Sequence, residues 1–272
     1  MGLFEVLKEK RNDNKIIYDI IPNANNERLN RLKNKILELN IDSKYKDFYL
    51  SQIKFSSGKF SYEDLYRQVI EYTNLLEFQN ENPYINYYPI LIDDKTYINN
   101  IALFIACLHL NLKPILINCE YIKELDNSIK IDDNSFGICS SGSVKKKLIS
   151  LSENMLLNSS IKSFENLSFY SINTINTISG INESIVYPIL NGTKVTINNK
   201  KNIFVGLSKS KANFITLPSN FREQLSKEYS IEDLDFSCVK LIILCGTYYS
   251  YEDIKYLCEK LKIKLNKIYL TY

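Results

Sequence analysis

The sequence FGICSSGSVKKKLISLSENM, residues 136–155, contains a short apolar strand, a hydroxyl-rich turn, a run of lysines, a second apolar strand and a helix start at Ser152. The turn consists of Ser140, Ser141, Gly142 and Ser143, and it is followed by Lys145, Lys146 and Lys147. Because concave backbone amides and nearby ammonium groups stabilise the same anion, this combination favours a polyphosphate site. The alternative interpretation is a strand-turn-strand hairpin whose basic tip is only solvated.

Length and composition indicate a folded protein that can bury a substantial core. The chain has 272 residues, of which 45% are hydrophobic, so one large or two small domains are expected. A formal net charge of +3 gives no strong field that would favour nucleic acid or an anionic membrane surface. The apolar runs, such as Ile101–Cys107, are too short to cross a bilayer, and the first residues lack the features of a signal peptide. We therefore expect a cytoplasmic protein with no membrane span and no nucleic-acid partner.

The cysteine and histidine content gives no indication of a metal site or a histidine-dependent mechanism. The 6 cysteines lie mostly in apolar runs without C-x-x-C spacing, so free thiols are expected and no metal ligand is predicted. The single histidine, His109, stands at the end of an amphipathic helix and is predicted to be structural. A Ser-His-Asp mechanism is therefore not expected.

Helical and strand patterns alternate along the chain, which predicts an α/β fold. Continuous apolar strands are expected at 86–92 and 114–118, with a helix at 96–110 between them. Such units are typical of a mostly parallel sheet, and we expect two successive mostly parallel α/β units. The predicted parts are a helical amino-terminal segment at 1–55, a first α/β subdomain with the phosphate loop at 56–165, and a second α/β subdomain at 166–272.

Later elements are predicted from the same patterns. Ser61 is expected to cap a helix that begins at Tyr62, and another helix is expected at 152–164. Further helices are expected at 181–190, 218–229 and 251–261, and further strands at 194–197, 213–217, 239–244 and 265–270.

The order of these segments resembles the large amino-terminal domain of the adenylate-forming enzymes, which include acyl- and aryl-CoA synthetases, nonribosomal-peptide adenylation domains and luciferases. Residues 139–155 are similar to the family's phosphate-binding motif, S/T-S-G-S/T-T-G-x-P-K-G-V, and the helix start that follows it. Other segments match in the same order: Phe60–Leu65 with T-Y-x-E-L, Ile90–Asn118 with the segment ending A-G-x-x-x-x-P-x-N, Pro188–Val195 with P-L-x-x-G-x-x-V, and Leu241–Thr247 with the strand leading into G-G-A. The resemblance covers about residues 55–272. It implies a truncated form of the family's large domain.

The resemblance implies a reaction in which ATP and a carboxylic or amino acid give acyl-AMP and pyrophosphate. It places Ser140, Ser141, Gly142 and Ser143 around the β- and γ-phosphates of ATP. Lys146 corresponds to the motif lysine, with Lys145 or Lys147 as alternatives.

Two further groups of residues are implied in the same way. Thr271 corresponds to the threonine near the α-phosphate, and Gly246 and Thr247 correspond to positions near the adenine or ribose. The acid pocket is expected between segments 170–185 and 214–221, and the Ser and Asn content of 171–184 suits a small polar acid.

The chain departs from the family pattern in ways that bear on activity. The phosphate loop is two residues shorter after Ser143, and Lys147 replaces the last glycine. Mg²⁺ is the metal implied for an active enzyme, but Tyr272 replaces its glutamate ligand, and a phenol cannot replace a carboxylate at neutral pH. The sequence also stops before the family's hinge and small carboxyl-terminal domain, so a carboxyl-terminal half or a carrier protein is an implied partner.

These observations leave three interpretations open. The first is an adenylate-forming ligase domain, acting as part of a split enzyme. The second is a catalytically inactive homologue that scaffolds or regulates a partner in a biosynthetic pathway. The third is an unrelated α/β protein of two units.

Overall fold

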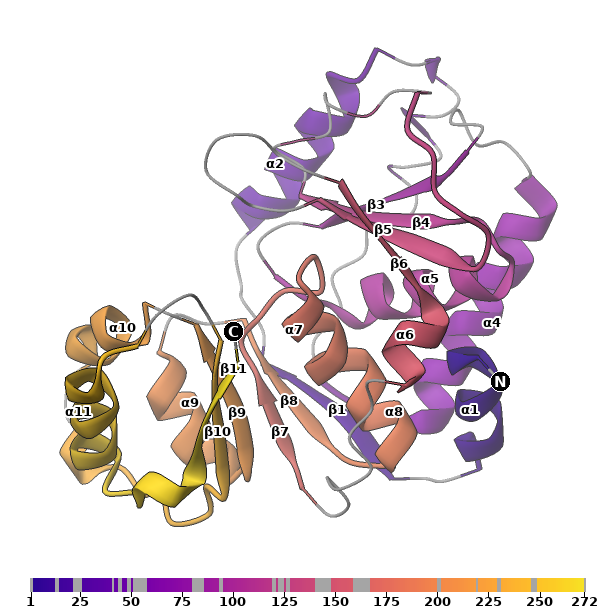
Figure 1. Ribbon diagram of the computed structural model, residues 1–272. Coiled ribbons are helices and arrows are strands. Elements are labelled where there is room, and N and C mark those ends of the chain that lie inside the picture. The colour runs from indigo at the N-terminus through magenta and orange to yellow at the C-terminus, as the bar shows by residue number, and fades with distance from the viewer. Residues whose placement is uncertain are drawn as a thin grey trace.

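The computed structural model shows an α/β protein built around two sheets (Figure 1). It describes residues 2–12, 15–21, 26–40, 42–43, 46–47, 50, 58–79, 86–92, 95–118, 121, 125, 128–139, 148–158, 167–199, 202–218, 220–228, 231–245 and 249–271. Both sheets are mostly parallel and are flanked by helices, which confirms the predicted fold class.

The elements are named in chain order. The strands are β1 (Ile16–Ile21), β2 (Gly58–Ser61), β3 (Tyr88–Ile92), β4 (Pro114–Asn118), β5 (Ser135–Cys139), β6 (Leu148–Ser152), β7 (Phe169–Ser171), β8 (Val195–Asn198), β9 (Phe214–Pro218), β10 (Leu241–Cys245) and β11 (Ile268–Thr271). The α-helices are α1 (Leu3–Lys10), α2 (Asn26–Leu37), α4 (Tyr62–Gln79), α5 (Ile98–His109), α6 (Glu153–Asn158), α7 (Ile178–Ile181), α8 (Tyr187–Asn191), α9 (Ile203–Ser210), α10 (Phe221–Lys227) and α11 (Tyr251–Leu261). Shorter helical turns are η3 (Asn182–Val186), η4 (Ile231–Asp233) and η5 (Leu265–Lys267).

The larger sheet contains seven strands in the described part of the chain, in the order β11-β10-β9-β7-β8-β1-β2. All neighbouring pairs are parallel except β1 and β2, which are antiparallel. Parallel strands need helical crossovers, and the alternation of strands and helices in the second half of the sequence provides them. As a result, the carboxyl ends of the parallel strands lie along one edge of the sheet.

The smaller sheet has the order β3-β4-β5-β6 among the described strands. β3, β4 and β5 are parallel, whereas β5 and β6 form an antiparallel pair in which Cys139 lies opposite Leu148. The predicted phosphate loop, residues 140–147, therefore connects the two strands of a hairpin and lies outside the described residues.

Helix starts in this half agree with the sequence. Ser61 Oγ accepts a hydrogen bond from the Asp64 amide at 3.1 Å, and Ser152 Oγ accepts one from the Met155 amide at 3.3 Å. Both serines therefore cap helices. The cap at Ser61 was predicted, whereas Ser152 was predicted as the first residue of its helix and stands just before α6.

The amino-terminal region differs from the prediction of a helical segment at 1–55. Residues 16–21 form β1, which lies between β8 and the edge strand β2 in the larger sheet. The run Ile16–Ile21 is rich in β-branched residues, which favour strands, but no strand was predicted within this segment. The strand Gly58–Ser61 joins the same sheet beside β1. In the second half of the chain, helix α9 was not expected from the sequence.

Side chains of the larger sheet alternate between two different environments. Ile215, Leu217, Ile242 and Leu244 belong to a buried cluster with residues of α9, α10 and α11. The residues between them on β9 and β10 face the opposite side, because successive side chains of a strand point to opposite faces. Figure 1 shows α9, α10 and α11 on one side of this sheet and α7 and α8 on the other.

The helical segment from α7 to α8 is continuous and contains a π-helical turn, η3. Pro188 has no amide hydrogen, so it cannot donate to the carbonyl of Ser184 four residues earlier. That carbonyl instead accepts a 2.6 Å hydrogen bond from the Tyr18 hydroxyl of β1. A carbonyl group of the π-helical turn thus receives its hydrogen bond from β1, a strand that lies far away in the sequence.

We expect Tyr18→Phe to lower the free energy of unfolding by about 1–3 kcal/mol, because it leaves the buried Ser184 carbonyl without a donor. The loss should be smaller in a Pro188→Ala background, where the amide restored at position 188 can donate to the same carbonyl. Urea denaturation of the two single variants and the double variant measures the difference. An equal loss in both backgrounds would contradict this role of Tyr18.

Candidate active site

The carboxyl ends of strands from the two sheets meet at Thr96, which lies just beyond β3. Its backbone amide and carbonyl are bonded to the side chain of Asn199, which directly follows β8, at 3.3 Å and 3.0 Å. Its hydroxyl accepts a 3.2 Å hydrogen bond from the amide of Ile175, beyond β7. Both Thr96 and Asn199 are buried. Ligand sites in parallel α/β sheets lie outside the carboxyl ends of the strands, so this junction marks the candidate site.

A cavity of about 250 Å³ lies between the larger sheet and the helical segment α7–η3–α8. The sheet contributes alternate residues of two adjacent strands, and the segment contributes residues from its first turns. The lining residues are Ile178, Ser179, Asn182, Glu183, Tyr187, Phe214, Thr216, Ile243 and Cys245. The cavity therefore lies between the two segments where an acid pocket was expected from the sequence, and it reaches the last residue of β10.

Glu183 is the principal polar group of this cavity, and only 2% of the residue is exposed. Its carboxyl accepts hydrogen bonds from the Ser171 hydroxyl at 3.3 Å and from the Asn173 amide at 3.2 Å and 3.3 Å. Burial raises the pKa of Glu183 to about 8, and hydrogen bonds from Thr216, Asn173 and Ser171 limit the rise. A carboxyl that changes charge near neutral pH inside a cavity is typical of a functional site.

Asn182, the neighbour of Glu183, adds a second polar group to the cavity lining. Its side-chain oxygen is buried and has no hydrogen-bond partner among the described residues. Adjacent helical residues normally point in different directions. Here the two lie in the π-helical turn η3, whose extra residue changes which side chains face the sheet.

Sequence reasoning did not select Glu183. The available signals were a lone carboxylate in an otherwise apolar helical stretch and Pro188 five residues later. Neither signal predicts a π-helical turn, and the Tyr18 hydroxyl that bonds to the Ser184 carbonyl within it comes from another part of the chain.

Most residues predicted to contact ATP lie outside the described part of the chain. These are Ser140, Ser141, Gly142, Ser143, Lys146, Gly246 and Thr247. Thr271 lies at the end of β11, and its backbone pairs with that of Cys245 of β10. Cys245 lines the cavity and immediately precedes Gly246, where the predicted adenine-side turn begins. The pairing of β10 with β11 therefore places the start of that turn next to Thr271, the predicted α-phosphate threonine.

His109 has a structural contact, as predicted. Its ring stacks on Phe4 of α1 with 3.7 Å between the ring centroids. It is not among the residues that line the cavity.

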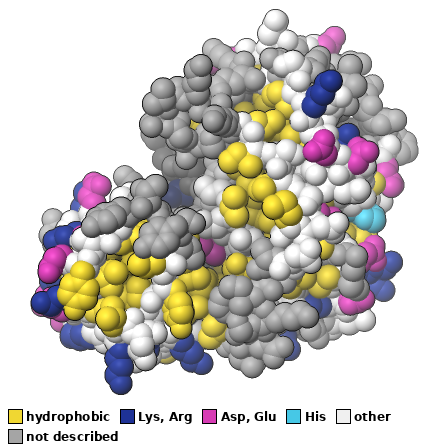
Figure 2. Space-filling model, in the orientation of Figure 1, with side chains coloured by type: hydrophobic (Ala, Val, Ile, Leu, Met, Phe, Trp, Pro, Cys, Tyr) yellow, Lys and Arg dark blue, Asp and Glu magenta, His cyan; other side chains and the backbone are white. Residues whose placement is uncertain are grey.

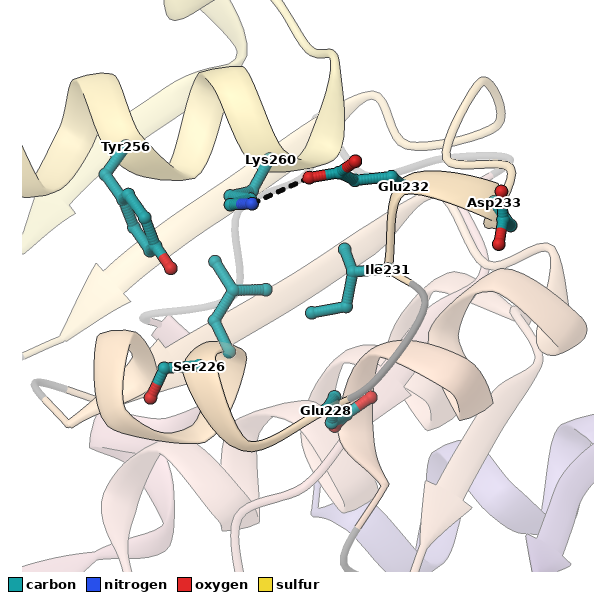
Figure 3. A pocket seen from close by; sticks show the side chains of 8 residues that line it. Ser226, Glu228, Ile231, Glu232, Asp233, Tyr256 and Lys260 are labelled. Carbon is teal, nitrogen blue, oxygen red and sulfur yellow. Dashed lines mark hydrogen bonds and ion pairs between the residues drawn. The ribbon is translucent and has the colours of Figure 1, made fainter.

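A second hollow, of about 350 Å³, lies between α10, η4 and α11 (Figure 3). Its polar side chains serve local contacts: Lys260 forms a 2.8 Å ion pair with Glu232, and Glu228 accepts hydrogen bonds from the Phe204 and Val205 amides at the start of α9. It is lined by residues of α10 and η4, by Glu228 between them, and by Tyr256 and Lys260 of α11, which point toward α10 and η4. Although it is larger, we favour the cavity at Glu183 as the candidate site.

The described residues offer no donor set for the Mg²⁺ ion that the family resemblance implies. In the described ranges, no group of three or more His, Cys, Asp or Glu side chains is placed to hold a metal ion. The position expected for the carboxylate ligand is occupied by Tyr272, which cannot supply it. None of the helices that the structure describes has the length and hydropathy needed to span a membrane.

Comparison with known proteins gives a match in structure alone. No sequence-family profile matches the chain, and no curated protein matches it in sequence. The structure is similar to a fatty acyl-adenylate ligase from L. pneumophila, with a TM-score of 0.68, 14% identity, and coverage of 98% of this chain and 54% of the ligase. It is also similar to the amide bond synthetase McbA from Marinactinospora thermotolerans, with a TM-score of 0.66, 10% identity, and coverage of 100% and 59%.

A third similar structure is the amino-terminal subdomain of Klebsiella oxytoca NpsA, with a TM-score of 0.64, 13% identity, and coverage of 99% of this chain and 71% of that one. The chain therefore has the fold of the large amino-terminal domain of adenylate-forming enzymes. It spans little more than half the length of the first two structures.

The raised pKa of Glu183 predicts a pH-dependent stability. The unfolded chain has this carboxyl near its ordinary pKa of 4.5, so the folded state binds more protons between pH 4.5 and about 8. The contribution of this proton binding to the free energy of unfolding is fully present below pH 4.5. It decreases by up to ~1.4 kcal/mol per pH unit as the pH rises and is lost above about pH 8. Denaturant unfolding of the wild type and Glu183→Gln from pH 5 to 8 should show a decline that the variant lacks.

The matched control for this experiment is Glu223→Gln. Glu223 is exposed on α10, and its ion pair with Lys227 lowers its pKa, so it titrates below this range. This variant should follow the wild type. Parallel curves for the wild type and Glu183→Gln would show that the carboxyl titrates as in the unfolded chain.

Proposed function

We propose that this chain is the acid- and nucleotide-binding part of an adenylate-forming ligase. It binds ATP and a small carboxylic or amino acid and forms acyl-AMP and pyrophosphate. The observation that carries the proposal is the position of the cavity at Glu183, at the carboxyl edge of the larger sheet and beside the residues that lead to Gly246 and Thr271. The similarity to structures of acyl-adenylate ligases supports the same assignment.

In this proposal the reaction depends mainly on positioning. A carboxylate oxygen of the acid forms a bond to the α-phosphorus while the bond from that phosphorus to the pyrophosphate oxygen breaks. The acid lies in the cavity at Glu183, and Thr271 contacts the α-phosphate. The loop residues Ser140, Ser141, Gly142 and Ser143 donate hydrogen bonds to the leaving pyrophosphate, and Lys146 balances its charge.

A partner that completes the site is part of the proposal, either a carboxyl-terminal half or a carrier protein. β11 is an edge strand of the larger sheet in the described structure, and Tyr269 and Leu270 on it are exposed by 58% and 37%. Figure 2 shows apolar side chains gathered over the lobe that contains β10 and β11. Exposed apolar surface of this kind is typical of a contact with another protein segment.

The second candidate function is a noncatalytic homologue that scaffolds or regulates a biosynthetic partner. Two features of the sequence favour it: the phosphate loop is short, and Tyr272 stands where a metal-binding glutamate is expected. Both functions use the same fold. They differ in whether the chain turns over ATP.

ATP–pyrophosphate exchange over a panel of amino, aryl and fatty acids separates the two functions. The ligase predicts acid-dependent exchange, either with the chain alone or after addition of its partner. If no acid supports exchange and ATP gives no thermal protection, only the scaffold function remains.

Lys146→Ala tests the phosphate-loop assignment. The variant should weaken ATP binding by about tenfold or more, because it removes a charge-assisted contact worth roughly 1.5–3 kcal/mol. Gly142→Val should also weaken ATP binding, since a side chain there blocks the approach of phosphate to the backbone. The control is Lys264→Ala, which removes an equal charge from an exposed position. Unchanged ATP affinity in both loop variants, measured by calorimetry, would show that the loop does not bind phosphate.

A further inference from the structure

We propose that a second copy of this chain covers the edge strand β11, in a two-fold dimer whose two β11 strands pair antiparallel. A completing partner would use the same surface, so the dimer is the state of the chain when no such partner is bound. The inference does not depend on the proposed function, because it concerns the oligomeric state and requires neither ATP nor an acid.

The first argument is the free hydrogen-bonding edge of the larger sheet. β11 pairs with β10 on one side, and no other described strand lies on its second side. Such an edge presents amide and carbonyl groups that can pair with another chain, and soluble proteins commonly block it with a charged side chain or a proline. The strand Ile268–Thr271 contains neither. It is therefore open to pairing with a strand from outside.

The second argument is the apolar surface along this edge. Leu270 lies on the same side of the sheet as its neighbour Leu244, which packs against α10 and α11, and Tyr269 lies on the opposite side. Two further exposed apolar side chains flank the strand, Tyr251 at the start of α11 and Leu265 in η5, with 67% and 55% exposure. A strand added at this edge covers both sides of the sheet at once, whereas a helix packed on one side covers only half of this surface.

The third argument is that the two ends of β11 complement each other. η5 leads into β11 and lies at its amino end, whereas α11 follows β10 and begins beyond the carboxyl ends of the strands. The amino end carries Leu265 and the exposed Lys264, and the carboxyl end carries Tyr251 and the exposed Glu252. Antiparallel pairing brings the amino end of one copy beside the carboxyl end of the other. Lys264 then faces Glu252, and Leu265 faces Tyr251.

A pairing centred on Tyr269 also suits the side chains of the strand itself. Tyr269 lies opposite Tyr269 of the second copy, and Ile268 lies opposite Leu270, so every cross-strand pair at the centre is apolar or aromatic. Parallel pairing would instead place Lys264 beside Lys264 of the second copy. Since a two-fold contact closes after two copies, we expect a dimer and no larger assembly.

Sedimentation velocity of the full chain tests the dimer over concentrations from about 1 to about 200 µM, a range suited to the affinity of a small interface. The wild type should show a monomer–dimer equilibrium. Tyr269→Lys should weaken dimerisation about tenfold or more, because it places a charge at the centre of the pairing. Met155→Lys is the matched control: Met155 is exposed by 60% on α6, and this variant should keep the wild-type equilibrium.

A charge exchange tests the antiparallel arrangement. Lys264→Glu and Glu252→Lys should each weaken dimerisation about fivefold or more, because like charges then face each other and the two-fold axis applies each change twice. The double variant should return to within about twofold of the wild-type equilibrium, since each pair again joins opposite charges. A change that acted only through the folding of one chain would not give this rescue.

The inference is overturned if the wild type is monomeric throughout the concentration range, or if the dimer persists unchanged in Tyr269→Lys. It is also overturned if the double variant does not recover, because the two ends of β11 then do not meet. Failure of the proposed function gives a different result: pyrophosphate exchange and ATP binding are absent while the dimer and its response to the variants persist.

Discussion

The hydrogen bonds of Thr96 hold the carboxyl ends of the two sheets together. Thr96 uses its amide, its carbonyl and its hydroxyl, and its partners lie beyond strands of the other sheet. Because all three atoms are bonded within a buried region, a shift of one sheet relative to the other would leave several polar groups unsatisfied. These bonds join the segment that follows β3 of the smaller sheet to the segments that follow β7 and β8 of the larger sheet.

Glu183 depends on a second constraint, which connects distant parts of the chain. The proline at position 188 leaves the Ser184 carbonyl free, the Tyr18 hydroxyl satisfies it, and the helix forms a π-helical turn at Asn182–Val186. That turn places two adjacent polar residues in the cavity lining. The same carboxyl is costly to bury and is held by donors from β7 and the loop that follows it. An apolar side chain at position 183 would avoid the free-energy cost of burying a carboxyl. The presence of glutamate at this position therefore favours a role in binding.

Much of the fold could be predicted from the sequence because apolar strands and amphipathic helices have distinct periods. The alternation of elements, the strand Pro114–Asn118 and the helix Tyr251–Leu261 follow from local patterns and were predicted correctly. The strand Ile16–Ile21 was missed, since its position beside β8 is decided by long-range pairing. A cavity lies between the two segments where the acid pocket was predicted, and its assignment as that pocket stays a prediction. Glu183 could not be identified from the sequence, because its burial arises from contacts among β1, β7 and β9 and the helix. The assignments at 140–147 and 246–247 remain predictions.

The central claim is that the acid and the nucleotide share one site at the carboxyl edge of the larger sheet. A crystal structure of the chain with a nonhydrolysable acyl-adenylate analogue, an acyl sulfamoyl adenosine, tests this claim most directly. We expect the acyl group beside Glu183 and Thr216 and the nucleoside beyond the end of β10 at Cys245. An analogue bound in the hollow near Glu232 and Lys260, or elsewhere away from the carboxyl ends of the strands, would contradict it.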